Sequence, residues 1–285
     1  MSAAEQESRY TEEIVRAAQA VSRADCVLIM VGAGMGVDSG LPDFRGNGGM
    51  YAQDGPFLSS GLDLLDIATT KALTERPRLA WGFQMRMFEM FRDAEPHAGH
   101  EVLLEWTRAR PYFVYTSNVD GQFQKAGFDP RRIVECHGSV HWLQSHMPEN
   151  QEGEVWPIGD LSLEVDPETG EALGELPVCP RTGKLARLNV LMFGDFEWLI
   201  TRTFEQEMAY EAWLERISSM RCVIVEAGAG VQIPSVHDQS EKLLRTLDDA
   251  TLIRINPERL RSPEGTIYVQ MGAAEALTRI NELVV

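Results

Sequence analysis

The sequence predicts an α/β fold in which a Rossmann-like parallel sheet, covered by helices on both faces, carries a small inserted module. An apolar, β-branched run at residues 26–31 (CVLIMV) is typical of a buried parallel strand. It leads directly into closely spaced glycines at residues 32–36, and strand-like and helical patterns alternate through the rest of the chain. A length of 285 residues allows one large domain with a smaller one inserted.

The remaining elements follow from the spacing of apolar residues. Helical spacing predicts a helix over residues 10–22 and a helical stretch over residues 62–92. One face of the second stretch is expected to be core rather than a ligand groove, and it carries Phe83, Met87, Met90 and Phe91. Further strands are expected at 112–116, 222–226, 251–255 and 266–270, in alternation with helices at 205–219, 238–248 and 273–283.

Residues 144–186 differ from the rest of the chain. They hold several prolines, glycines and acidic residues with little periodicity, and residues 166–170 (DPETG) indicate a turn. We expect a small, loop-rich module here, inserted between the halves of the large domain. The expected division assigns residues 1–50, 93–143 and 187–285 to the Rossmann-like domain and residues 51–92 and 144–186 to the module.

Composition narrows the range of partners. The formal net charge of −17 argues against nucleic acid and would suit a basic peptide, although a solvated acidic surface is the favoured explanation of the charge. No apolar run approaches the ~18 residues of a membrane span, and the N-terminus lacks the pattern of a signal peptide. Four cysteines lack the spacing of a disulfide framework, so Cys26 and Cys222 are expected to be buried thiols and the location cytoplasmic.

Three motifs carry the candidate chemistry. Residues 32–46 read GAGMGVDSGLPDFRG, a glycine turn of the kind that brings main-chain N–H groups near a pyrophosphate, followed by an acid, an aromatic ring and a guanidinium. The glycine pattern alone is a weak signal, because Val37 stands where the dinucleotide fingerprint has its third glycine. Residues 116–121 read TSNVDG directly after an expected strand, and residues 135–139 read ECHGS.

Together these motifs resemble the sirtuins, the NAD-dependent protein deacylases. That family carries GAGxSxxSGIPDFR, then TQNID, then HG, in this order and at about these separations. Residues 192–195 (MFGD) resemble the family's Phe-Gly-Glu segment, and the resemblance extends from about residue 10 to the C-terminus. It implies that NAD binds in the cleft between sheet and module, and that the chain removes acyl groups from lysine while releasing nicotinamide and O-acyl-ADP-ribose.

The resemblance also implies roles for individual residues. His137 would be the general base that takes a proton from a ribose hydroxyl, as its unperturbed pKa of about 6.5 allows. Asn118 would contact the nicotinamide ribose, Asp120 the carboxamide, and Phe193 and Gly194, with His137, an acyl-lysine substrate added as a strand. The residues implied in cofactor binding are Gly32, Ala33, Gly34, Gly36, Asp43, Phe44, Arg45, Ser117, Asn118, Asp120, Gly228, Ala229, Asn256 and Ala273.

The module departs from the family pattern. Typical sirtuins hold a structural zinc with two Cys-x-x-Cys pairs, and a structural zinc site normally has four ligands. The aligned positions here are Ser145, Pro148, Cys179 and Thr182, so one thiol of four remains. We therefore predict no metal, and the chain resembles divergent bacterial members of the family.

Other departures bear on the cofactor and the acyl group. Gly36 and Ser117 replace a serine and a glutamine that normally reach the cofactor, and residues 227–229 (AGA) replace the phosphate-binding Gly-Thr-Ser. The neighbouring Glu226 raises the question of how its charge avoids repelling phosphate. Members that remove acidic acyl groups resemble one another in a Tyr-x-x-Arg pair, for which this chain has Gln84 and Met87, so neutral acyl groups are expected.

Three functions are compatible with these residues. The leading one is an NAD-dependent protein lysine deacylase, because His137 is retained. A mono-ADP-ribosyltransferase or NAD hydrolase working in the same cleft is the alternative, and a non-catalytic NAD-sensing module is the second alternative.

Overall fold

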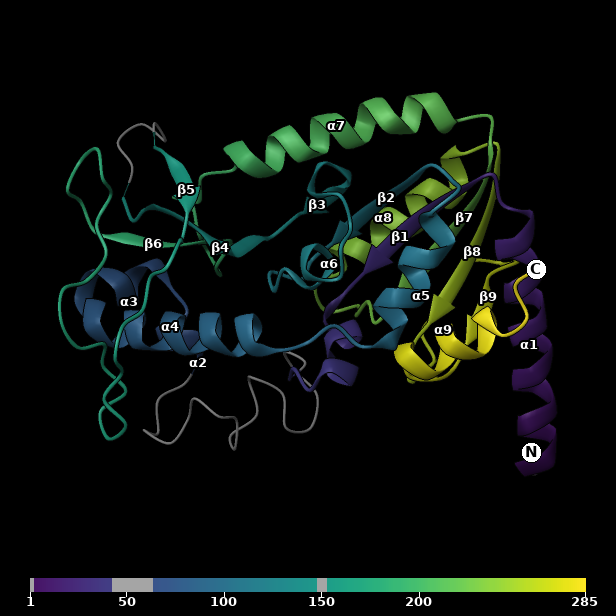
Figure 1. Cartoon of the computed structure of the whole chain (residues 1–285), viewed down its shortest axis with the longest axis horizontal. Helices are drawn as coiled ribbons and strands as arrows, with labels where there is room; N and C mark the ends of the chain where they lie inside the picture. Colours follow the sequence, from purple (N-terminus) through teal and green to yellow (C-terminus); the bar gives the residue numbers. More distant parts are fainter. Residues whose placement is uncertain (1–2, 43–63, 148–152) are drawn as a thin grey trace.

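Six parallel strands form one sheet in the computed structural model, which describes residues 3–42, 64–147 and 153–285, with side chains from residues 11 and 66 onward in the first two ranges. The strand order is β3-β2-β1-β7-β8-β9, and every neighbouring pair is parallel (Figure 1). The predicted α/β class is therefore confirmed. The strands are β1 (Cys26–Val31), β2 (Tyr112–Thr116), β3 (Ile133–Glu135), β7 (Arg221–Ala227), β8 (Asp249–Ile255) and β9 (Ile267–Val269).

Strand β1 lies at the centre of the sheet, and all six of its residues are buried. Because side chains alternate along a strand, its two faces enter different cores. Val27 and Ile29 pack in the cluster that includes Trp106, whereas Leu28 packs with Trp213 on the other face. This two-sided burial explains why the strand is apolar at consecutive positions.

Helices cover both faces of the sheet (Figure 1). One face packs against α1 (Ala3–Arg23), α5 (Ala98–Thr107) and α9 (Ala273–Asn281), and the other packs against α7 (Thr201–Ile217) and α8 (Ser235–Thr246). Short segments complete the domain: η1 (Ala33–Ser39), α6 (Gln122–Lys125) and η2 (Pro130–Arg132). Within the described part of the chain, no helix combines the length and the apolar character needed to cross a membrane.

A second, antiparallel sheet forms the small module, beside helices α2 (Leu64–Ile67), α3 (Thr70–Glu75) and α4 (Pro77–Asp93). Its order is β5-β4-β6, with β4 (Gly138–Ser145), β5 (Val155–Pro157) and β6 (Ala186–Val190). Trp81 fixes α4 to this sheet, because its buried Nε1–H donates to the Ala186 carbonyl at 2.8 Å. The expected domain boundary after residue 143 falls inside β4, and the expected boundary before residue 187 falls inside β6. Because β4 and β6 pair with each other, their hydrogen bonds span both expected boundaries.

The interpretation of Cys26 and Cys222 as thiols is wrong. Both side chains are buried as expected, but the structure joins them in a disulfide. The cause is the parallel register, which places Cys26 opposite Cys222 on neighbouring strands with their Cα atoms 5.0 Å apart. The two cysteines are 196 residues apart, so their spacing in the sequence does not indicate that they pair. Cysteine usage therefore gives no support for a reducing compartment.

Candidate active site

Two glycine-containing loops interlock at the carboxyl edge of the sheet, after β1 and β7, where the strand order reverses. The Gly32 N–H donates to the Ala227 carbonyl at 3.1 Å, and the Gly34 N–H donates to the Gly228 carbonyl at 2.9 Å. A Cβ added to Gly34 would lie 2.8 Å from the Gly228 Cα atom. Glycine is thus required for the loops to approach each other. These two N–H groups therefore hold the loops together, and the approach of a pyrophosphate to other N–H groups of the glycine run stays a prediction.

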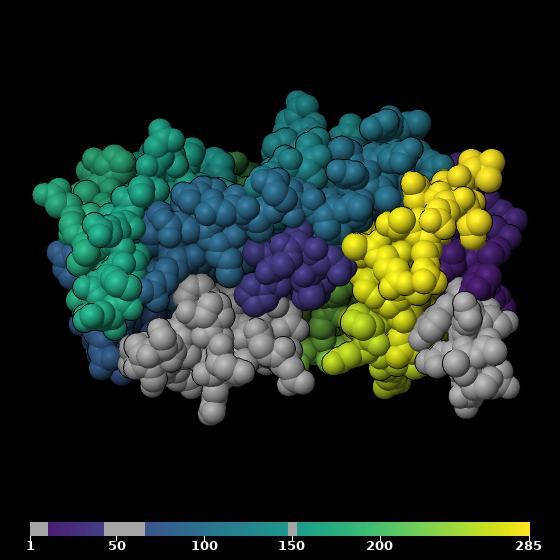
Figure 2. Space-filling view, turned by 60° about the horizontal axis from the view of Figure 1, so that its bottom comes forward, coloured from purple at the N-terminus to yellow at the C-terminus, as the bar shows by residue number. Residues whose placement is uncertain are grey.

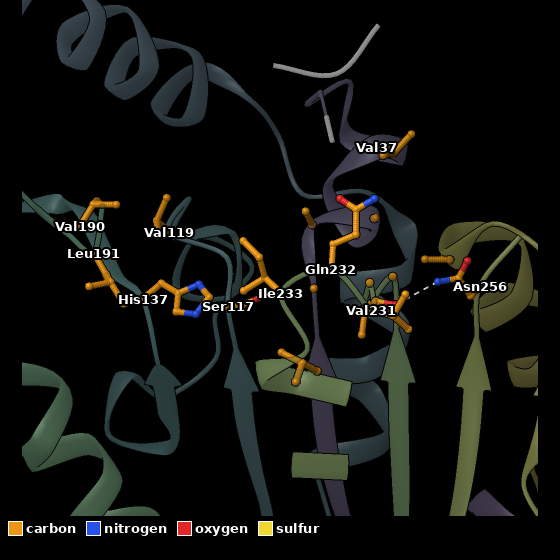
Figure 3. Close-up of a pocket in the computed structure, with 18 of the residues that line it drawn as sticks. Val37, Ser117, Val119, His137, Val190, Leu191, Val231, Gln232, Ile233 and Asn256 are labelled. Carbon is orange, nitrogen blue, oxygen red and sulfur yellow. Dashed lines mark hydrogen bonds between the residues drawn. The ribbon is translucent and has the colours of Figure 1, made fainter. Parts of the chain in front are cut away.

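A cavity of about 550 Å³ opens at this edge, between the sheet and the small module. Figure 3 shows its floor at the tips of the parallel strands, with His137 at one side and Asn256 at the other. Most of the predicted site residues are brought together here. Those that line the cavity are Gly32, Ala33, Gly34, Ser117, His137, Phe193, Gly228, Ala229, Asn256 and Ala273.

The other predicted residues lie elsewhere. Gly36, Asn118 and Asp120 line a second, small cavity, to which Ala33 also contributes. Gly194 lines neither cavity. Asp43, Phe44 and Arg45 lie outside the described residues, so their implied roles stay predictions.

His137 is held by two hydrogen bonds at the side of the cavity nearest the module. Its Nε2 atom lies 3.1 Å from the Ser235 hydroxyl at the start of α8, and the ring also hydrogen-bonds the Ser117 carbonyl. Burial lowers the pKa of the imidazole below its ordinary value, and the bond to the Ser117 carbonyl opposes this shift. The ring is therefore neutral near pH 7, the state in which histidine can accept a proton.

Asn118 and Asp120 project from the turn after β2 and are both buried. The Asn118 backbone N–H donates to the Thr116 hydroxyl at 3.0 Å, but the side-chain Oδ1 atom of Asn118 has no hydrogen-bond partner. Burial raises the pKa of the Asp120 carboxyl to about 6, against the Gln122 N–H that donates to it at 2.9 Å. An unpartnered buried acceptor and a carboxyl whose ionised form is disfavoured by burial lie beside one small cavity, which is the pattern of a ligand-binding site without its ligand.

The Asp120 shift predicts a stability effect with a definite sign. The pKa is higher in the folded chain (about 6) than its ordinary 3.8, so ionisation destabilises the fold as pH rises from about 4 to about 6. Asp120→Asn cannot ionise and is expected to be more stable than wild type at about pH 8, by up to about 3 kcal/mol, and equal to it below about pH 4. Urea unfolding at both pH values measures this. Asp129→Asn, where the pKa is lowered, is the control, and equal stability of Asp120→Asn and wild type at about pH 8 contradicts the prediction.

The side of the cavity opposite His137 is formed by backbone and by two side chains, Asn256 and Asp38, that already make hydrogen bonds within the protein. The Asn256 amide donates to the Ala229 carbonyl at 3.1 Å and accepts from the Glu258 N–H at 2.9 Å, so it connects the loop after β7 to the turn after β8. The Asp38 carboxylate accepts from the Ala274 N–H at 2.8 Å and caps helix α9 beside Ala273. Figure 2 shows the purple η1 segment at the surface, between the blue helices and the yellow C-terminal segment.

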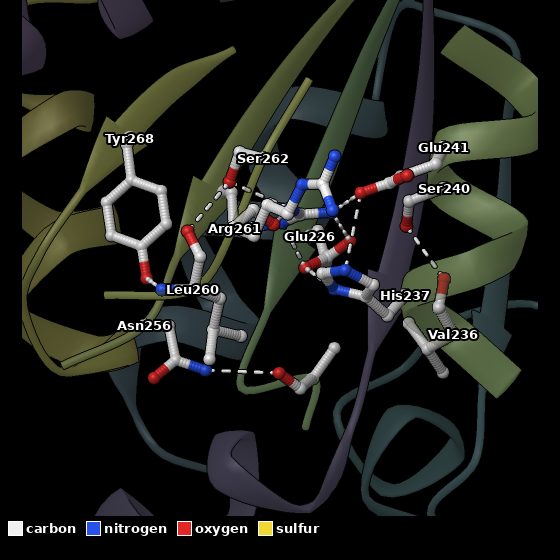
Figure 4. A network of polar contacts seen from close by, with 12 residues as sticks. Glu226, Val236, His237, Ser240, Glu241, Asn256, Leu260, Arg261, Ser262 and Tyr268 are labelled. Atoms are coloured by element: carbon white, nitrogen blue, oxygen red, sulfur yellow. Dashed lines mark hydrogen bonds and ion pairs between the residues drawn. The ribbon is translucent and has the colours of Figure 1, made fainter. Parts of the chain in front are cut away.

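Glu226 does not face the cavity, and its charge is neutralised beneath the loop. Arg254 on the next strand donates to both carboxylate oxygens, at 2.7 and 3.1 Å, in a pair whose side chains are 1% and 0% exposed (Figure 4). The remaining Arg254 N–H groups reach the Ser262 hydroxyl at 2.8 Å and Glu241 at 3.4 Å. His237 lies 3.6 Å from Glu226. The charge next to the cavity is therefore balanced inside the protein, which answers the question raised by the sequence.

The 191–195 segment is anchored next to His137. The Leu191 N–H donates to the His137 carbonyl at 2.9 Å, and Asp195 forms a fully buried ion pair with Arg187 at 2.8 Å. Phe193 is 42% exposed at the cavity rim. This arrangement suits an edge for a substrate peptide, a role that stays a prediction for Phe193 and Gly194.

The positions aligned with zinc ligands still gather around Cys179. Ser145 and Thr182 both hydrogen-bond its thiol, whereas Pro148 lies outside the described residues. In the part of the chain that the structure describes, no group of three or more His, Cys, Asp or Glu residues has the arrangement of a metal site. At two of the aligned positions, hydroxyl side chains that hydrogen-bond the Cys179 thiol therefore stand where the family has metal-binding thiolates.

Several residues of the site were missed by sequence reasoning. Ser235 contacts His137 from a helix 98 residues away, and no local signal reveals it. Asp38 also lines the cavity. It lies within the glycine run at residues 32–46, and this place in the run was the sequence signal that could have identified it. Residues 231–233 follow the second glycine loop and line the cavity as well.

Comparison with known proteins finds relatives that all belong to one family. The Sir2 family model matches residues 32–217. The NAD-dependent protein deacylase 2 of Pyrobaculum aerophilum is 30% identical over 263 residues, which are 92% of this chain and 91% of that protein. The NAD-dependent protein deacylase 2 of Pseudomonas syringae pv. tomato is 26% identical over 272 residues, 94% of this chain and 98% of that protein.

Solved structures share the fold. A mutant Sir2 homologue in complex with ADP-ribose has a TM-score of 0.69 at 18% identity and covers 94% of this chain and 95% of its own. Sir2Tm bound to a propionylated peptide has a TM-score of 0.64 at 18% identity, with coverages of 93% and 95%. The architecture of sheet and module is therefore that of these proteins.

Proposed function

The chain belongs to the Sir2 family, and from this premise we propose that it is an NAD-dependent protein lysine deacylase in which His137 is the general base. The observation that carries the proposal is the position of a neutral, doubly hydrogen-bonded His137 at a cavity that interlocked glycine loops also line. A cytoplasmic location and a basic acyl-lysine protein as partner are part of the proposal, and the net charge of −17 supports such a partner.

The residues present fit NAD. Gly32, Gly34 and Gly228 let the two loops pack closely where they line the cavity, and the unpartnered Oδ1 atom of Asn118 offers an acceptor to a hydroxyl or amide. Asn256 and Ala273 would hold the adenosine half, and Asn118 and Asp120 the nicotinamide half. When bound, NAD supplies an electrophilic ribose carbon with nicotinamide as its leaving group.

The overall reaction breaks the acyl-lysine amide bond and the bond from ribose to nicotinamide. An ester to ADP-ribose forms, one water is consumed, and lysine leaves as the ammonium ion. In this reaction His137 would accept the proton of a ribose hydroxyl on the nitrogen lone pair that the Ser235 hydroxyl contacts here, while the Ser117 carbonyl, which can only accept, holds the protonated ring nitrogen. Asp120, when ionised, would accept a hydrogen bond from the carboxamide. Its pKa of about 6 means that this acceptor is present at neutral pH.

The test is a product analysis of the purified full chain with NAD and a basic peptide that carries one acyl-lysine. We expect nicotinamide, deacylated peptide and O-acyl-ADP-ribose in equal amounts by mass spectrometry, and no nicotinamide without the acyl group. Nicotinamide release without acylated peptide, together with ADP-ribose on protein, would instead establish the transferase or hydrolase. Binding of NAD with no release in either condition would establish the sensing module.

A further inference from the structure

His137 lies in the turn that connects the two sheets of the molecule. Strand β3 ends at Glu135 and belongs to the parallel sheet, whereas β4 begins at Gly138 and belongs to the antiparallel sheet of the module (Figure 1). Gly138 has a positive φ of 80°, and a Cβ atom there would lie 2.0 Å from the Asn189 carbonyl oxygen, so the chain turns tightly between the sheets. The direction of the His137 side chain therefore depends on how β3 and β4 are oriented relative to each other.

Helix α7 fixes the strand before His137. Because β3 is at the edge of its sheet, one side of its backbone needs partners other than a strand. The Glu135 N–H donates to the Gln206 Oε1 atom at 3.0 Å, and the Thr203 hydroxyl donates to the Glu135 carbonyl at 3.2 Å. The Glu135 side chain is 1% exposed, and its carboxylate forms an ion pair with Arg202. Residues of α7 thus hold both the backbone and the charge of the residue two positions before His137.

Arg202 also contacts the strand that follows His137. Its guanidinium lies over the Trp142 ring of β4, 4.9 Å from the ring centroid. A planar guanidinium can lie over an aromatic ring while its N–H groups donate to a carboxylate, which a methionine side chain cannot do. Arg202 therefore joins Glu135, on one side of His137 in the chain, to Trp142 on the other.

We infer that Arg202 is a positioning residue for His137. By joining Glu135 to Trp142, it fixes the orientation of β3 relative to β4 and with it the direction in which the imidazole faces the cavity. The inference rests on the proposed function, in which His137 is the general base. Arg202 is not among the described residues that line either cavity, so it would act through His137 and not on a bound molecule.

The first experiment measures kcat of the full chain with saturating NAD and acyl peptide. Arg202→Met is expected to lower kcat by about 10- to 100-fold, because a small displacement of a reacting group is costly, while NAD affinity by calorimetry stays within about threefold of wild type. Trp142→Leu keeps the ion pair but removes the ring, and it is expected to lower kcat at least about threefold. Arg216→Met is the matched control, since Arg216 is an exposed arginine in the last turn of α7, and its kcat is expected to equal that of wild type.

A double variant separates positioning from stability. Arg202→Met leaves the Glu135 carboxylate buried without its partner, which destabilises the fold. Glu135→Gln/Arg202→Met removes that charge, so its midpoint of urea unfolding is expected to return towards the wild-type value while kcat stays low. A kcat restored together with stability would overturn the inference, because the loss would then come from buried charge. Wild-type kcat in Trp142→Leu would overturn it as well, because the contact with β4 would then have no effect on the base.

A spectroscopic readout tests the positioning without turnover. In a chain with isotope-labelled histidine nitrogens, the His137 ring signals are identified by their absence from His137→Ala. We expect these NMR signals to shift in Glu135→Gln/Arg202→Met, as the bond to the Ser117 carbonyl weakens, and to stay unchanged in Arg216→Met. Unchanged signals in the double variant overturn the inference and leave the deacylase standing. Shifted signals in a chain that shows no deacylation support the positioning by Arg202 while the proposed function fails.

Discussion

His137→Ala is expected to lower acyl-dependent nicotinamide release by about 10²- to 10⁴-fold, the range measured when a positioned general base is removed. The ring is the side chain at the cavity with both a lowered pKa and two orienting partners, Ser117 and Ser235. Its removal takes away the proposed proton acceptor but leaves the glycine loops that line the cavity. Steady-state kcat/KM with a saturating acyl peptide measures the loss.

The matched control is His146→Ala. His146 is also buried and hydrogen-bonded, to the Thr74 hydroxyl at 2.9 Å, but it does not line either cavity. Its variant is expected to retain turnover. NAD affinity of His137→Ala, measured by calorimetry, is expected to stay within about threefold of wild type. Full activity of His137→Ala would refute its role as base, and loss of NAD binding would show that the residue holds the cofactor instead.

The pH dependence should reflect two groups. Burial lowers the pKa of His137, so the ring stays neutral below its ordinary range, whereas burial raises that of Asp120 to about 6. As pH falls through about 6, Asp120 takes up its proton and the proposed hydrogen-bond acceptor is lost. We therefore expect the acid limb of kcat/KM to include the protonation of Asp120, and Asp120→Asn to change the shape of that limb in a pH profile.

Local pattern was enough to predict the parts of the fold that depend on consecutive residues. The run at 26–31 is apolar at every position because β1 is buried on both faces, and that two-sided burial is visible in sequence. The order of the glycine, TSNVDG and ECHGS motifs likewise placed Ser117 and His137 at one cavity. These signals are local, or depend only on where parallel strands end.

Contacts set by register were not predictable. Cys26 faces Cys222, and Glu226 faces Arg254, because neighbouring parallel strands align these positions. Nothing in either segment alone specifies the partner strand or its offset. The hydroxyl of Ser235 reaches His137 for a similar reason, through the docking of α8. The sequence therefore identified candidate chemistry but not the groups that orient it or balance its charge.

Arg254→Met is expected to destabilise the fold by about 3–5 kcal/mol, because it leaves the Glu226 carboxylate buried without its partner. The pair joins β7 to β8 with both side chains buried, directly under the loop that carries Gly228 and Ala229. The same Arg254 guanidinium also holds the Arg261 carbonyl at 3.0 Å. Loss of both contacts should loosen the second glycine loop, so NAD affinity should fall together with stability.

The double variant Glu226→Gln/Arg254→Met separates buried charge from lost packing. Removing the carboxylate charge is expected to restore most of the lost stability, since replacing both partners of a buried ion pair is often nearly neutral. Arg245→Met is the control, because Arg245 pairs with Glu241 at 3.5 Å but is 64% exposed, and its loss should change the free energy of unfolding by less than about 1 kcal/mol. Urea titration measures all three. If Arg254→Met proved as stable as wild type, the buried Glu226 carboxylate would not depend on Arg254, and the prediction would be wrong.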